Sequence, residues 1–327
     1  MKKQCRRIIV LINLIFFIFS ENINNKDENQ NNKNNIKLKL LDDGDVSEYK
    51  CLHVFSGYVY PDSVYLNGKE RDLDNDGCIY ISINDIEETY IVKLEWNKPI
   101  NNCAYLFYCV YDVVEIDLSE FDASEVTSMS YMFYYCDMLE NIKFGNINTS
   151  SLTETDEMFS NCESLYSIDL SNFDTSKINS MNRMFFSCSK LSSLNLTNMN
   201  TSQITNMEYL FYGLQSLKEI DLSNFDMSKV TSMEYFFCYC DSLTSINFGY
   251  LNTSKVITLA CLFCLYKSLK TIIISKFDTS SVIDMGYMFY GLESLTSLDL
   301  SIFNTSNVYY MDYMFAFSTS IITINFT

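Results

Sequence analysis

Proline and glycine are scarce in this chain of 327 residues, which has two prolines and nine glycines. Its turns must therefore be made by Asn, Asp, Ser and Thr, whose side chains hydrogen-bond to nearby backbone groups. Histidine is scarcer still, because His53 is the only one. A single histidine excludes most Ser-His-Asp and Cys-His mechanisms unless His53 itself serves. His53 is far in sequence from any reactive-looking Ser or Cys, so we expect no enzyme.

Basic residues are outnumbered, with 23 Lys and Arg against 41 Asp and Glu, and the net charge is -18. This acidity argues against nucleic acid and anionic membranes as partners. Because carboxylates are abundant, residue type alone does not exclude a glycosidase. Most of these carboxylates, however, recur at fixed positions of the repeat, so the repeat itself accounts for their presence. Neither a P-loop nor a dinucleotide fingerprint occurs. The cysteines lack the paired C-x-x-C spacing of a zinc site. We therefore expect no cofactor.

Long apolar runs are absent except in residues 8–19, which follow Lys2, Lys3, Arg6 and Arg7 and precede Ser20. This pattern predicts a secretory signal peptide over residues 1–20, because a membrane span needs about 20 apolar residues. An uncleaved signal anchor is the alternative. After removal of the signal we expect no transmembrane span and a secreted or cell-surface protein. The polar, Asn-rich residues 21–35 predict a disordered linker.

An apolar residue followed by Phe recurs every 26 positions, and a fixed period of this size indicates a repeat protein. We number each repeat from the apolar residue, as position 0. The pairs are Leu106-Phe107, Met132-Phe133, Met158-Phe159, Met184-Phe185, Leu210-Phe211, Phe236-Phe237, Leu262-Phe263, Met288-Phe289 and Met314-Phe315. The period predicts a solenoid over residues 102–327.

Apolar residues also recur at positions 7, 10 and 12, as in the L-x-x-I-x-L strand of a leucine-rich repeat. Positions 10 and 12 point inward from one strand face, and stacked strands make a parallel sheet. The return segment spaces its apolar residues three or four apart, which is helical spacing. We therefore predict an α/β leucine-rich-repeat solenoid with a parallel sheet on one face and short helices or 3₁₀ turns on the other.

Residues 36–101 lack the period and predict a small antiparallel β cap domain. Alternating segments at 36–40, 79–83 and 90–96 indicate strands, and Asn67-Gly68 indicates a hairpin turn. The domain either covers the first repeat or acts as a separate recognition domain. Asp72, Asp74 and Asp76 match the first half of a calcium loop. Ile83 stands where that loop needs Glu, so a polar turn is the alternative.

The repeat unit, as in residues 225–243 (FDMSKVTSMEYFFCYCDSL) and 277–295 (FDTSSVIDMGYMFYGLESL), resembles the BspA-like leucine-rich repeat surface proteins of mycoplasmas, other bacteria and protists. The resemblance covers about residues 103–327. It implies a cell-surface or secreted location and a role in adhesion to host or extracellular protein. The chain departs from the prokaryotic members in its cysteine content and in lacking a lipid-anchor cysteine, which makes an AT-rich protist at least as good a source.

Position 11 points outward from each strand, and solenoids bind partners on such surfaces. The candidate binding residues are Asp117, Lys143, Asp169, Asn195, Asp221, Asn247 and Asp299, in the same column as Ile273 and Asn325. A basic protein segment or a glycan would suit this column, and a solvated strand face is the alternative. Aromatic residues near the other edge could add a contact surface. They are Tyr131, Tyr134, Tyr135, Tyr209, Tyr212, Tyr287, Tyr290, Tyr309, Tyr310 and Tyr313.

Position 16 alternates strictly between Asp and Asn, which indicates a double repeat of 52 residues. Each Asn of this column begins an N-x-Ser/Thr glycosylation sequon, although Asn and Asp are also interchangeable turn formers. The glycosylation candidates are Asn148, Asn195, Asn200, Asn252, Asn304 and Asn325. Position 18 is Ser in all eight units, from Ser124 to Ser306, which predicts a hydroxyl ladder to turn backbone groups.

Twelve cysteines occur, and eleven remain if Cys5 leaves with the signal. Cys51 and Cys78 are the disulfide candidate. Cys136, Cys162, Cys188 and Cys240 share position 4. Because helices pack 8–10 Å apart and bridged Cα atoms lie within about 7 Å, we expect buried free thiols there.

Two functions fit this sequence. The first is an exported solenoid that binds an extracellular protein or a glycan. The second is a structural surface-coat or matrix component that self-associates. Its last predicted strand, residues 324–326, has no polar cap, and an open end exposes a core layer.

Overall fold

The computed structural model describes residues 34–42, 49–82, 87–248, 251–272, 274 and 277–326. The predicted signal peptide and residues 21–33 of the predicted linker lie outside these ranges. Asn34 and Asn35, predicted as the end of the linker, instead begin the first strand and are buried. Residues 33–327 group into one compact unit.

The strands before the repeats are antiparallel, as the alternating sequence predicts. They are β1 (Asn34–Leu41), β2 (Tyr49–His53), β3 (Ser63–Leu66), β4 (Lys69–Arg71), β5 (Cys78–Ser82) and β6 (Thr89–Trp96). Strands β4, β3, β6 and β1 lie side by side in this order, and β2 pairs with β5. Asn67 and Gly68 turn β3 into β4 with φ of 49° and 78°, the positive values that such a hairpin needs.

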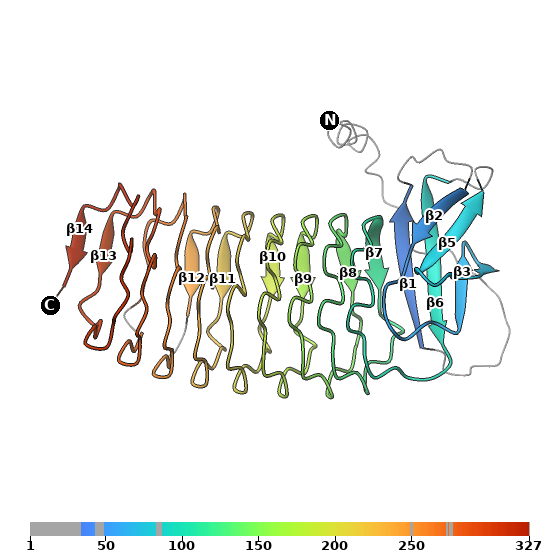
Figure 1. The fold of residues 1–327 in the computed structure, drawn as a ribbon, viewed down its shortest axis with the longest axis horizontal. Helices are drawn as coiled ribbons and strands as arrows, with labels where there is room; N and C mark the ends of the chain where they lie inside the picture. Colours follow the sequence, from blue (N-terminus) through green and yellow to red (C-terminus); the bar gives the residue numbers. More distant parts are fainter. Residues whose placement is uncertain are drawn as a thin grey trace. The chain divides into compact units, whose positions relative to one another are not determined.

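Strand β1 joins this sheet to the repeats. It pairs on its other edge with β7 (Val113–Asp117), which pairs in parallel with β8 (Asn141–Lys143). The six strands β4-β3-β6-β1-β7-β8 therefore form one sheet (Figure 1). The first coil is also fastened by Ser56, whose Oγ donates to the Tyr108 carbonyl at 2.7 Å. The edge of the first repeat strand thus has a hydrogen-bonded neighbour.

The repeat strands follow one another in a row (Figure 1) and pair in parallel at a register of one repeat. They are β9 (Ser167–Asp169), β10 (Ser193–Asn195), β11 (Glu219–Asp221), β12 (Ser245–Asn247), β13 (Ser297–Asp299) and β14 (Thr323–Asn325). Ladders join β7 to β8, β9 to β10, β11 to β12 and β13 to β14. Strand β13 begins 78 residues, or three coils, after β11, so this pairing does not follow the 52-residue double repeat throughout.

The predicted helices and 3₁₀ turns are wrong, since the described residues contain neither. The return segments are flat, and alternate N–H groups donate to the next coil, as Phe107 N does to Met132 O at 2.9 Å. Positions -1 and 3 have positive φ in every coil, for example 62° at Tyr105 and 58° at Cys109. A right-handed helix needs negative φ throughout, so these residues prevent it. The fold is a β-solenoid of stacked coils.

The phenylalanine of position 1 forms a stack through the core. Neighbouring rings from Phe107 to Phe315 are stacked, with centroids 5.1 Å to 6.3 Å apart. Each such pair contributes about 0.5–1.5 kcal/mol beyond the burial of its area. The repeated Phe is therefore core, as its regular spacing indicates.

Position 17, and not the serine of position 18, carries the hydroxyl ladder. Thr201 Oγ1 donates to the Asp226 carbonyl at 3.0 Å and accepts the Asp226 N–H at 2.7 Å. The same pair of bonds is made by Thr149, Thr175, Thr253 and Thr279, all buried. Ser202 instead donates its N–H to Asn200 of its own turn. The inward-pointing position supplies the link between coils.

Candidate functional site

The outward column at position 11, predicted to bind a ligand, is engaged in hydrogen bonds of the coil stack. Asp221 Oδ1 accepts the Ser223 N–H at 2.8 Å and the Asn247 side chain at 3.1 Å. The hydrogen bonds from Ser223 hold the pKa of Asp221 below its ordinary value. The same turn is closed by Asp117, Asp169, Asn195 and Asp299. Lys143 pairs with Glu115 at 2.5 Å. Ligand binding by this column stays a prediction.

The predicted calcium segment forms a tight turn before β5. Asp74 Oδ1 accepts the N–H groups of Asp76 at 3.0 Å and Cys78 at 2.7 Å. Gly77 has φ of 76°, and a Cβ there would lie 1.7 Å from the Phe55 carbonyl oxygen. Within the described ranges, no group of three His, Cys, Asp or Glu side chains is placed to hold a metal ion. These hydrogen bonds close the polar turn that the sequence left as the alternative, and calcium binding by this segment stays a prediction.

The sequon asparagines of position 16 lie exposed at a coil corner. Asn200 Oδ1 accepts the Ser202 N–H at 3.0 Å, and Asn148, Asn252 and Asn304 close the same turn. Asn195 is half-buried and Asn325 is exposed. Glycosylation of these residues stays a prediction.

Two disulfides occur among the described residues. One joins Cys51 and Cys78, the candidate pair from the sequence, with Cα atoms 5.4 Å apart. The other joins Cys238 and Cys264, at position 2 of neighbouring coils, with Cα atoms 4.7 Å apart. The sequence reasoning missed the second pair because it placed helices there, although the exact 26-residue separation was visible.

The cysteines of position 4 are buried free thiols. Cys162 Sγ donates to the Phe133 carbonyl at 3.0 Å, and Cys136, Cys188 and Cys240 make the same bond. Burial raises the pKa of Cys188 to about 12, so this thiol is neutral. The expected helix spacing was the wrong reason for free thiols, since the coils are close enough to bridge. Each thiol is instead directed at a backbone carbonyl.

The best candidate site is on the return segments. We define the return face as the side chains at positions -5, -4, -2 and -1, which fall in residues 101–105, 127–131, 153–157, 179–183, 205–209, 231–235, 257–261, 283–287 and 309–313. Position -4 of each coil bridges in parallel to the next, from Asn102 to Tyr310. The face is therefore as regular as the strand row.

Aromatic rings stack along position -1 of the return face. Tyr105 lies on Tyr131 with centroids 4.8 Å apart, and Tyr209 lies on Tyr235 at 4.6 Å. Tyr287 stacks on Tyr313 at 5.1 Å. Because these residues have positive φ, they occupy a conformation that bulky side chains rarely adopt. The tyrosines named in the sequence analysis at this position thus form an ordered array.

Charge on the return face is almost all negative. Arg183 is the one Lys or Arg among the residues of this face. The carboxylates are Glu154, Asp156, Glu157, Glu208, Glu234, Asp284 and Asp312. Burial, with the nearby carboxylates of Glu208 and Asp284, raises the pKa of Glu234. Burial also raises the pKa of Asp156, although Ser180 donates to its Oδ1 at 2.6 Å. These acids were not singled out from the sequence because their columns are mixed.

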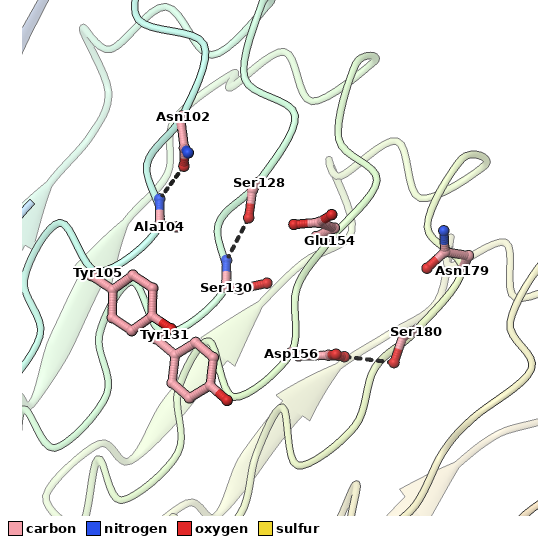
Figure 2. Close-up of a pocket in the computed structure, with 10 residues that line it drawn as sticks. All are labelled: Asn102, Ala104, Tyr105, Ser128, Ser130, Tyr131, Glu154, Asp156, Asn179 and Ser180. Carbon is pink, nitrogen blue, oxygen red and sulfur yellow. Dashed lines mark hydrogen bonds between the residues drawn. The ribbon is translucent and has the colours of Figure 1, made fainter. Parts of the chain in front are cut away.

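A groove of about 390 Å³ lies at the start of the return face (Figure 2). Tyr105 and Tyr131 stand along one side, with Ser130 beside them. Glu154 and Asp156 come from the next coil. The groove thus offers hydroxyls, carboxylates and ring edges, and no metal-ligating cluster.

A model of the family described as "Mycoplasma protein of unknown function, DUF285" matches residues 101–194, 162–248, 187–273 and 239–325. These matches take in nearly all the coils and more than half of the chain. The chain belongs to this family. Its membership confirms the BspA-like type of repeat that the sequence resembles.

The structural comparison finds a crystal structure of a leucine-rich repeat protein from Bacteroides ovatus ATCC 8483. The two chains share 19% identity, with a TM-score of 0.42. The match covers 72% of this chain and 66% of the length of that protein. Among curated proteins, none matches this member of the family.

Proposed function

We propose that this family member is an exported repeat protein that binds an extracellular protein or a glycan. The observation that carries the proposal is the return face. The inward columns of each coil consist of buried Phe, Leu, Met, Cys and Thr residues of the repeat. Core packing accounts for these columns without a binding partner. The return face keeps tyrosines, acids and amides in an ordered array, together with a groove.

Export rests on the predicted signal at residues 1–20, which lies outside the described residues. The described part of the chain has no helix that is long and apolar enough to cross a membrane.

Catalysis forms no part of this proposal. His53 Nε2 lies 3.1 Å from Ser56 Oγ, but that hydroxyl donates to the Tyr108 carbonyl. Burial lowers the pKa of His53. The pair lies where the first strands meet the first coil, and its bonds support a fastening role.

The test is capture of extracellular proteins and a glycan array by the full immobilised chain. Ser130→Arg would fill the groove with a bulky side chain, at a position where other coils carry Asn or Glu. Ser193→Arg, on an exposed strand position, is the matched control. We expect Ser130→Arg to abolish capture and Ser193→Arg to retain it. If both variants lose capture equally, the return face is not the binding surface. If the wild-type chain captures neither a protein nor a glycan, the proposed binding function is contradicted.

A further inference from the structure

One cation already lies within the return face and indicates what this face accepts. Arg183 stands at position -1, in the column of stacked tyrosines. Its guanidinium carbon is 4.4 Å from the centre of the Tyr209 ring, and a guanidinium nitrogen is 3.7 Å from Glu157. A planar guanidinium therefore fits the spacing of the coils, between a carboxylate on one side and a ring on the other.

The remaining carboxylates of the face have no such cation. Arg183 pairs with Glu157, and no ion pair joins Glu154, Glu208 or Glu234 to a base in the described part of the chain. Glu208 only accepts the Asn182 side chain at 3.4 Å. Glu208 and Glu234 are half-buried, and removing acids from water without a counter-charge is unfavourable, so a cation from a partner would be stabilising beside them.

The stacked rings offer little to a sugar. A sugar ring stacks on an open aromatic face, whereas Tyr209 is covered by Arg183 on one side and by Tyr235 on the other. Tyr131 has one face against Tyr105. What these residues present is mainly ring edges and phenol hydroxyls, which accept hydrogen bonds from a guanidinium. The face favours a basic peptide over a glycan.

The spacing of the acids suits an extended chain. Glu154 lies at position -4 and Glu208 at position -2, so they are two coils, or roughly 10 Å, apart along the stack and about 7 Å apart across it. Glu234, at position -2 of the next coil, lies roughly 5 Å further on. Alternate side chains of an extended peptide are about 7 Å apart. Long arginine side chains can cover the difference, so a segment of about five residues spans these three carboxylates.

We propose that the return face binds an extended, arginine-rich protein segment laid along the coils across Glu154, Glu208 and Glu234. This inference rests on the proposed function and narrows its partner to a protein with exposed arginines.

The test uses the full chain and a fluorescein-labelled nine-residue peptide in which Arg and Ser alternate. Fluorescence anisotropy gives its affinity for the wild type, for Glu208→Gln/Glu234→Gln and for Glu140→Gln/Glu219→Gln. The last variant removes the same charge at exposed positions outside the face. We expect the face variant to weaken binding about three- to tenfold, as for two exposed ion pairs, and the control to change it less than twofold. The same peptide with Lys should bind more weakly, because ammonium lacks the bidentate fork.

Equal weakening in both variants would overturn the inference, because net charge alone would then explain binding. Absence of peptide binding to the wild type would overturn it too. If Ser130→Arg still abolishes capture of an extracellular partner in that case, the proposed function survives and only the arginine-rich partner is lost.

Discussion

Short polar side chains close the corners of each coil. At position -4 Asn206 accepts the N–H of Glu208 at 2.8 Å, and at position 16 Asp226 accepts that of Ser228 at 2.9 Å. These bonds do what glycine and proline do in other turns. The scarcity of both residues, visible in the sequence, thus has a structural counterpart at the level of single side chains.

The buried threonine ladder provides a stability prediction. Thr201→Val keeps the shape of the side chain but leaves the N–H and the carbonyl of Asp226 without their partner. We expect a loss of about 2 kcal/mol in the free energy of unfolding. Thr201→Ser keeps the hydroxyl and should lose much less. Denaturant unfolding measures both, and an equal loss would contradict the hydrogen-bond explanation.

The corner carboxylates predict how stability changes in acid. Hydrogen bonds from Ser176 and Ser228 lower the pKa of Asp174 and of Asp226 below the ordinary value of 3.8. The unfolded chain therefore takes up protons first, and stability present above about pH 4 is lost as pH falls through the folded pKa values. Asp174→Asn/Asp226→Asn keeps both turns without titrating. Urea unfolding between pH 6 and 2.5 should show a shallower acid loss in this variant, and an unchanged profile would refute the assignment.

At the scale of the element, the flat return segment decides which residues meet. Backbones of neighbouring coils lie close enough for the Cys238–Cys264 bridge and for the stacked tyrosines. The spacing of apolar residues by three or four was a misleading signal for a helix. The return segment makes a turn every four residues, at positions -1 and 3, and such turns bury the same positions as a helix would. The left-handed backbone of residues such as Tyr105 and Cys109 could not be predicted from their residue types, since Tyr and Cys rarely adopt this conformation.

The disulfide between coils predicts a measurable contribution. Its 26-residue separation gives about 3.5 kcal/mol of stability from the restricted unfolded chain. Cys238→Ala/Cys264→Ala should therefore unfold at lower denaturant than the wild type. Cys51→Ala/Cys78→Ala is the comparison for the bridge between β2 and β5. If the first variant unfolds like the wild type, Cys238 and Cys264 are not bridged in solution.

Asp and Asn alternate along position 16, and stacked coils place the residues of this column about 5 Å apart. Asn200→Asp would put carboxylates on three successive coils, next to Asp174 and Asp226. We expect a loss of about 1 kcal/mol at low salt that shrinks at 0.5 M NaCl. Asn200→Ser keeps a turn-forming side chain without charge, and it should show no salt dependence. A salt-independent loss in Asn200→Asp would contradict this explanation.

At the scale of the whole molecule, the 26-residue period predicted the coils, the strand register and the buried columns, because identical positions must stack in a solenoid. It also directed attention to the tyrosines of the return face. Arg183, Glu208 and Glu234 were missed because position -1 and position -2 vary from coil to coil. Their common face becomes visible only when the backbone places these columns side by side.

The alternation of Asp and Asn at position 16 limits how this array can grow. Removing a coil whose position 16 is Asn, or duplicating one whose position 16 is Asp, would bring two aspartates together at this position, whereas a change of two neighbouring coils preserves the alternation. Recombination between repeats would therefore conserve stability in steps of 52 residues. The length of the array, and with it the reach of its surface, should change between related genes by whole pairs.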